Sequence, residues 1–140
     1  MEIFMSGEID SGAYDSFSQI SNEIEARIKN LESNEYGTEI DSLGIIPIIV
    51  NLTPDLENAG FFKERMLFSH KKKEADYRLR IDYNRFINSD NRMKKLLIIK
   101  NIIDSIRLLG KKAKKDFNAK KLEDDILMLF EVRKETIDNL

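Results

Sequence analysis

The sequence predicts a single domain, residues 1–140, of the α+β class, in which a small, mainly antiparallel sheet carries its helices on one face. Strand-like and helix-like segments follow one another in the order β-α-β-β-β-α-α. With 140 residues, 41% of them hydrophobic, the chain is long enough to bury one core. No internal repeat or low-complexity linker divides it, so one domain is expected.

The strands are predicted from β-branched content and from alternation. Residues 2–5 form a short first strand, and residues 39–52 a second that is rich in β-branched residues, mainly isoleucine. Pro47 lacks a backbone donor and therefore indicates an edge position or a bulge in that strand. Residues 61–69 and 75–83 predict a hairpin, because the latter segment strictly alternates apolar and charged side chains.

The clearest periodic signal predicts a helix over residues 13–32, which Asp10 or Ser11 can cap. Its apolar side chains recur every three or four residues and form one narrow stripe: Ala13, Phe17, Ile20, Ile24, Ile28 and Leu31. The opposite face and its flank are polar: Asp15, Ser18, Asn22, Glu23, Glu25 and Lys29. The stripe is expected to pack on the core and the polar face to meet water.

Two further helices are predicted in the last third of the chain. The first covers residues 91–110, can be capped by Ser89 or Asp90 and ends at Gly110. Apolar side chains lie on two sides of this helix, which predicts a position between the sheet and another helix. The second helix covers residues 117–132, and residues 134–140 are expected to fray.

Composition excludes several classes of function. The chain has no cysteine and one histidine, His70, so no disulfide, no metal and no cofactor is expected. His70 falls beside three lysines in a predicted turn, where nothing orients it for acid–base catalysis, and no nucleotide-binding, metalloprotease or hydrolase motif occurs. We therefore expect no catalytic residue and no enzyme. Without a signal peptide or a run of about 18 apolar residues, a cytoplasmic protein with no membrane partner is expected.

Charge is distributed unevenly although the net charge is only −2. Residues 1–60 contain 12 acidic and 2 basic residues, whereas residues 61–121 contain 7 acidic and 19 basic ones. Two interpretations stay open: the two parts neutralise each other within the fold, or the acidic part is a docking surface for a basic protein. On the second interpretation, the expected partner-binding residues are Glu8, Asp10, Asp15, Glu23 and Glu25.

The opening segment Met1–Ile9, MEIFMSGEI, with the acidic amphipathic helix after it, resembles small immunity proteins of bacterial polymorphic-toxin and contact-dependent growth-inhibition systems. The resemblance implies a binding protein without catalytic residues, whose partner is the C-terminal toxin domain of an effector from a sister cell. Such toxins are often nucleases with a basic active site. The resemblance then implies that the acidic surface faces the cationic cleft of the toxin and occludes it.

Two alternatives belong to other classes. A small RNA-binding module would use Lys71–Lys73 and the connector Lys111–Lys115. Against it, the basic residues of the helix over 91–110 scatter around the helical wheel instead of forming one phosphate-binding face, so nucleic acid is not the favoured partner. An enzyme would have to use His70, without a supporting residue.

Overall fold

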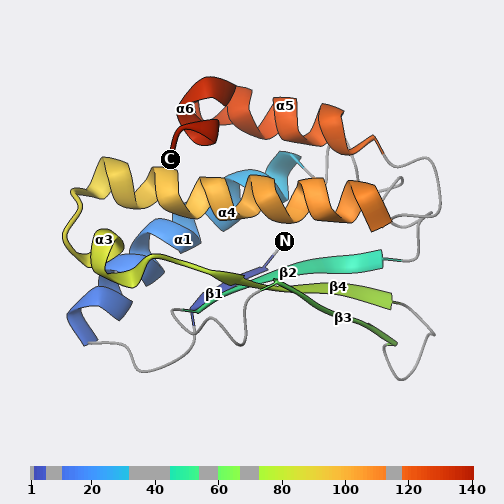
Figure 1. Cartoon of the computed structure of the whole chain (residues 1–140), viewed down its shortest axis with the longest axis horizontal. Coiled ribbons are helices and arrows are strands. Elements are labelled where there is room, and N and C mark those ends of the chain that lie inside the picture. The colour runs from blue at the N-terminus through green and yellow to red at the C-terminus, as the bar shows by residue number, and fades with distance from the viewer. Residues whose placement is uncertain (1, 6–10, 32–44, 54–59, 67–72, 113–117) are drawn as a thin grey trace.

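The chain folds into a sheet that helices cover on one face (Figure 1). The computed structural model describes the following residues: 2–5, 11–31, 45–53, 60–66, 73–112 and 118–140. In chain order the elements are β1 (Glu2–Met5), α1 (Ser11–Leu31), β2 (Ile45–Thr53), β3 (Gly60–Met66), β4 (Lys73–Arg80), α3 (Tyr83–Ile87), α4 (Asn91–Lys112), α5 (Ala119–Leu129) and α6 (Lys134–Asp138).

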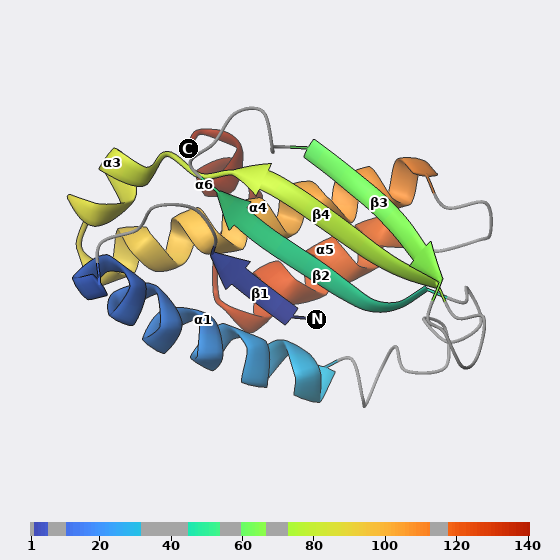
Figure 2. The same ribbon diagram turned by 90° about the horizontal axis from the view of Figure 1, so that it is seen from below.

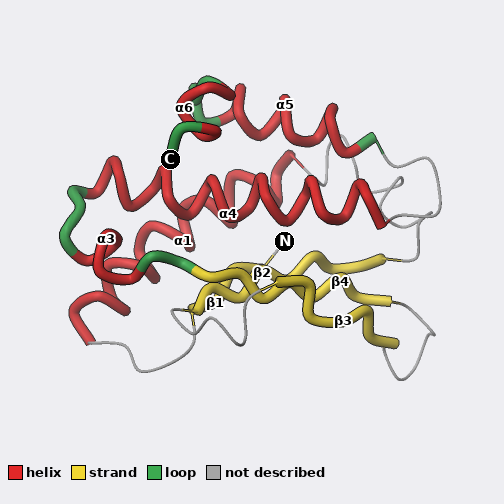
Figure 3. The backbone as a smooth tube through the Cα atoms, in the orientation of Figure 1, coloured by secondary structure: helices red, strands yellow, loops and turns green. Residues whose placement is uncertain are grey.

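Helix α4 lies at the centre of this arrangement. It contacts β2 and β4 on one side and α5 and α6 on the other, which the backbone trace shows as stacked layers (Figure 3). Helix α1 contacts both α4 and β1, and it runs along the β1 side of the sheet when the molecule is viewed from below (Figure 2). The prediction that the helix beginning near residue 91 lies between the sheet and another helix is confirmed.

The sheet has the strand order β1-β2-β4-β3. Strands β1 and β2 are parallel, with Glu2 opposite Ile49, and β2 and β4 are also parallel. Strands β3 and β4 are antiparallel and form the predicted hairpin. The interruption expected at Pro47 is present as a register shift between Ile45 and Ile48, although β2 is an inner strand of the sheet and not an edge.

The fold class expected from the sequence is wrong. Two of the three strand pairs are parallel, so the sheet is not mainly antiparallel, and α1 is the crossover between the parallel strands β1 and β2. Among the described side chains, the buried apolar core is helical: apart from Ile81, each member lies in a helix or, like Phe130, in the turn that ends one. The described part of the chain thus combines a set of packed helices with a mixed, largely parallel sheet.

The predicted helices are present with shifted ends. Helix α1 agrees with its prediction to within two residues at each end. Helix α4 continues through Gly110 to Lys112, so Gly110 is not the end of the helix, and α5 ends at Leu129. The short helix α3 was not predicted; it begins after Asp82, whose carboxylate accepts a hydrogen bond from the Arg85 backbone N–H at 3.1 Å.

The expectation that residues 134–140 fray is wrong. They include α6, whose Ile137 side chain is 0% exposed, and Leu140 packs against the same core. Ile137, Leu140 and an ion pair between Asp138 and Arg107 hold a five-residue helix that has little stability of its own.

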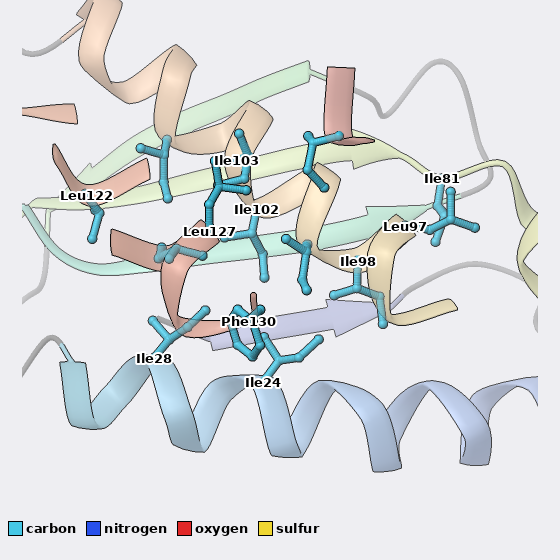
Figure 4. Close-up of a cluster of buried hydrophobic side chains, with 14 of the residues drawn as sticks. Ile24, Ile28, Ile81, Leu97, Ile98, Ile102, Ile103, Leu122, Leu127 and Phe130 are labelled. Atoms are coloured by element: carbon cyan, nitrogen blue, oxygen red, sulfur yellow. The ribbon is translucent and has the colours of Figure 1, made fainter. Parts of the chain in front are cut away.

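The apolar stripe of α1 packs as predicted. Phe17, Ile24 and Ile28 are buried, and Ile20 and Leu31 pack at the edge of the same cluster. Figure 4 shows Ile24 and Ile28 pointing from α1 toward Phe130 and toward α4. This burial fixes the rotation of α1 about its axis, and it therefore decides which α1 side chains face water.

Candidate functional site

The outer face of α1 is the candidate site that the sequence predicts. Because the apolar stripe faces the core, Asp15 and Glu23 are exposed and Glu25 is half-buried. Glu8 and Asp10, the other two predicted contact residues, lie outside the described residues. The structure thus places three of the five predicted carboxylates on one helix, with Asp15 and Glu23 about 12 Å apart along its axis.

Glu23 forms an ion pair with Lys95 of α4. The Lys95 Nζ atom lies 3.1 Å from Glu23 Oε1, while 58% of the Glu23 side chain and 30% of the Lys95 side chain remain exposed. An exposed pair of this kind contributes less than about 1 kcal/mol. The pair therefore orients Glu23 without removing its charge from the surface. Within the described part of the chain Asp15 has no ion-pair partner.

The two basic residues of α1 differ in environment. Arg27 is half-buried, donates a hydrogen bond to the Leu129 carbonyl oxygen and lies over the Phe130 ring, 4.7 Å from its centroid. Lys29 is exposed. Arg27 therefore anchors α1 to the end of α5 through a cation–π contact. Among the exposed side chains of the helix, two carboxylates, Asp15 and Glu23, outnumber the one cation, Lys29.

Within the described part of the chain, several cations of α4, although not Arg92, have partners. Lys94 Nζ donates to Ser16 Oγ at 3.1 Å, and Lys100 pairs with Asp104 at 2.8 Å. Arg107 pairs with Glu123 of α5. These contacts come from different sides of α4, so the helix does not present one phosphate-binding face. Of the lysines that the RNA-binding alternative needs, Lys111 is exposed, and Lys71, Lys72 and residues 113–115 lie outside the described residues.

No metal-binding arrangement is seen in the described part of the chain. Within that part, no three His, Asp or Glu side chains are placed to hold a metal ion. His70, the only histidine, lies outside the described residues. No described helix is long and apolar enough to cross a bilayer.

A cleft that the sequence did not predict lies between α4 and the α5–α6 corner. We call it the α4–α6 cleft; it has a volume of about 370 Å³ and is lined by Arg92, Lys95, Leu96, Ile99, Phe130, Glu131, Val132, Arg133 and Thr136. Lys95 belongs both to this cleft and to the ion pair with Glu23. The outer face of α1 and the α4–α6 cleft therefore meet at the Glu23–Lys95 pair.

A family comparison supports the resemblance seen in the sequence. The family model of immunity protein 44 matches residues 1–132. The chain belongs to the immunity protein 44 family. Among curated proteins and among solved structures no match is found. The matched residues of this immunity protein include all of α1, α4 and α5, and they end before α6.

Membership of this family confirms that the chain is an immunity protein. Family membership therefore implies a toxin as the partner and the role of a toxin inhibitor. Family membership alone assigns no contact residue, so the geometry of α1 and of the α4–α6 cleft has to supply the candidates.

Proposed function

We propose that this immunity protein binds its cognate toxin domain stoichiometrically through the outer face of α1 and the segment before it. Glu8, Asp10, Asp15, Glu23 and Glu25 contact a basic surface of the toxin, which is a nuclease whose substrate cleft they occlude. The observation that carries this proposal is the exposure of Asp15 and Glu23 on a helix whose other side is buried.

A rigid helix suits such an interaction. Phe17, Ile24 and Ile28 hold α1 against the core, so its carboxylates lose little additional freedom on binding. Carboxylates that approach a cationic cleft also steer the encounter and raise the association rate at low salt. Close charge pairs in such complexes contribute about 1.5–7 kcal/mol of coupling energy.

The test is a double charge reversal, Asp15→Lys with Glu23→Lys, in the full chain. The partner in the assay is a catalytically inactive form of the cognate toxin domain. Two lost pairs at the low end of the range above weaken binding about 100-fold in calorimetry. The matched control, Asp124→Lys with Glu135→Lys, changes the net charge equally at exposed positions on α5 and α6. The control is expected to bind within about threefold of wild type.

We expect the double variant to protect cells that express the active toxin less well than wild type, and the control variant to protect them as well as wild type. Loss of the Glu23–Lys95 pair costs less than about 1 kcal/mol, so the double variant remains folded and its circular dichroism matches wild type. If the double variant binds and protects like wild type, α1 is not the contact surface.

Whether the immunity protein occludes the substrate cleft of the nuclease can be tested separately, by competition with substrate. A short oligonucleotide substrate competes with the immunity protein for the inactive toxin, because both occupy the same basic surface. A stable complex of toxin, immunity protein and oligonucleotide would show that the immunity protein binds away from the substrate cleft.

A further inference from the structure

The α4–α6 cleft has an apolar floor and a charged rim. Ile99 and Phe130 are buried at its base, and Leu96 and Val132 are half-buried. The rim contains three cations, Arg92, Lys95 and Arg133, and one acid, Glu131. The lining of the cleft therefore has a net positive charge, although the net charge of the whole protein is −2.

The two arginines of the rim are available to a ligand. Arg92 and Arg133 are exposed, and in the residues that the structure describes neither has an ion-pair partner. Lys95 Nζ is held 5.4 Å from the centroid of the Phe130 ring while it pairs with Glu23. Guanidinium groups bind carboxylates through two parallel hydrogen bonds, so two unpaired arginines at one cleft favour a carboxylate ligand.

The backbone of the cleft is fixed before any ligand binds. At the end of α5 the Val132 N–H donates to the Leu127 carbonyl at 2.9 Å, and the Glu131 N–H donates to the Met128 carbonyl at 3.1 Å. This pair of bonds is the Schellman motif, and it sets Glu131 in the left-handed region with φ 56°. Figure 1 shows the resulting corner, where α5 turns into α6 on the side of α4 away from the sheet. A preformed site loses little entropy on binding.

We propose that the α4–α6 cleft is a second contact site for the toxin and that it receives an acidic side chain on an apolar segment of the toxin. Charge complementarity selects the carboxylate, and the floor of Leu96, Ile99, Phe130 and Val132 selects the apolar neighbour. A nucleic-acid phosphate fits less well, because it leaves the apolar floor uncovered and meets Glu131 on the rim.

This inference rests on the toxin being the partner and adds to the proposed role of α1. The acidic face of α1 and the basic cleft are adjacent through Glu23 and Lys95, so a toxin that engages both must present a basic patch beside an acidic one. A toxin with one sign of charge over the whole area is repelled at one of the two sites. Selection of the cognate toxin follows from this pairing of opposite charges.

The test uses two cleft variants of the full chain and the inactive toxin domain described above. Arg92→Glu with Arg133→Glu reverses the rim charge, and Thr136→Trp fills the cleft without changing charge. We expect binding to weaken about 30-fold for the charge reversal and about 10-fold for Thr136→Trp. The matched control, Lys120→Glu with Lys134→Glu, alters exposed cations outside the cleft and is expected to bind within about threefold of wild type.

The outcomes separate this inference from the proposed role of α1. If the cleft variants bind like wild type while Asp15→Lys with Glu23→Lys binds weakly, the cleft is not a contact site and the α1 proposal stands. If only the cleft variants bind weakly, the cleft is the contact site and the α1 proposal is wrong. A single-stranded RNA oligonucleotide that binds the wild-type chain, but not Arg92→Glu with Arg133→Glu, would overturn the protein ligand in favour of nucleic acid.

Discussion

Arg107 of α4 and Glu123 of α5 form the most buried ion pair in the described part of the chain. The Arg107 Nε and Nη2 atoms both donate to Glu123 Oε1, the former at 3.0 Å, and only 10% of the Glu123 side chain is exposed. Nη1 of the same guanidinium lies 3.0 Å from Asp138 of α6. One arginine thus joins three helices, two of which line the α4–α6 cleft.

Removal of Arg107 is predicted to destabilise the fold. Arg107→Met leaves the Glu123 carboxylate buried without a counterion, and we expect the free energy of unfolding to fall by about 2–3 kcal/mol. This value is below that of a fully buried pair because 33% of the Arg107 side chain is exposed. Urea denaturation measures the loss. The double variant Arg107→Met with Glu123→Leu should recover most of the lost stability, because it removes the buried carboxylate as well. If the single and the double variant lose equal stability, the unpaired Glu123 carboxylate is not the cause of the loss.

The contribution of Arg107 should not change with pH near neutrality. Hydrogen bonding to Glu123, opposed by burial and supported by Asp138, raises the pKa of Arg107 above its usual value. A raised folded-state pKa gives stability that is complete below the unfolded-state pKa and is lost only as the pH rises through the folded-state one. Both pKa values lie far above neutrality, so Arg107→Met should cost the same at about pH 6 and about pH 9.

Gly110 of α4 lies directly against Ala119 of α5. A Cβ atom added at Gly110 would lie 2.5 Å from the Ala119 Cβ atom. Helix propensity alone favours alanine over glycine by about 1 kcal/mol. We expect the contact to reverse this preference, so that Gly110→Ala lowers the free energy of unfolding by about 1–3 kcal/mol.

Ala119→Gly is the matching change for Gly110→Ala. It removes the atom that the new Cβ would meet, so the double variant should be more stable than Gly110→Ala alone. Thermal denaturation of the two single variants and the double variant measures this coupling. Additive effects would show that the helices adjust without strain.

The sequence predicts what depends on local periodicity. The stripe of Phe17, Ile24 and Ile28 repeats at helical spacing, so both the inner and the outer face of α1 follow from it. Alternation identifies a strand but carries no direction, so the parallel pairing of β2 with β1 and β4 could not be predicted.

The α4–α6 cleft could not be predicted for a different reason. Arg92 and Arg133 are 41 positions apart and meet only because α5 packs back on α4. The turn at Glu131 also lacks the usual signal, since glycine is the common residue at this helix-terminal position. The cleft is formed by tertiary packing, which a local sequence pattern does not predict.

Ile137 is predicted to anchor α6. Its side chain is fully buried, so Ile137→Ala should lower the free energy of unfolding by about 2–4 kcal/mol, or release α6 at a similar cost. Hydrogen exchange separates these outcomes, because release of α6 raises exchange only near the C-terminus. Asn139→Ala, at an exposed neighbour, should change stability by less than about 0.5 kcal/mol. An unprotected C-terminus in the wild-type chain would contradict the docking of α6.

We predict that the left-handed backbone conformation of Glu131 lowers the stability of the fold. Glu131 adopts a left-handed backbone conformation, which costs a residue other than glycine about 1 kcal/mol or more in the folded state. Part of this cost is offset because such a residue loses less backbone entropy than glycine when the chain folds. Glu131→Gly should therefore raise the free energy of unfolding by about 0.5–1 kcal/mol. Glu131→Ala keeps the strained backbone and should give no such gain, which makes it the control.

The same two variants show what the Glu131 side chain does at the α4–α6 cleft. Both remove the one acid of the rim, so both should bind an acidic segment of the toxin more tightly than wild type, but with less discrimination against other acidic segments. Calorimetry with the inactive toxin and with an unrelated acidic protein measures both effects. If Glu131→Gly is more stable while both variants bind like wild type, the strain at Glu131 has no part in recognition.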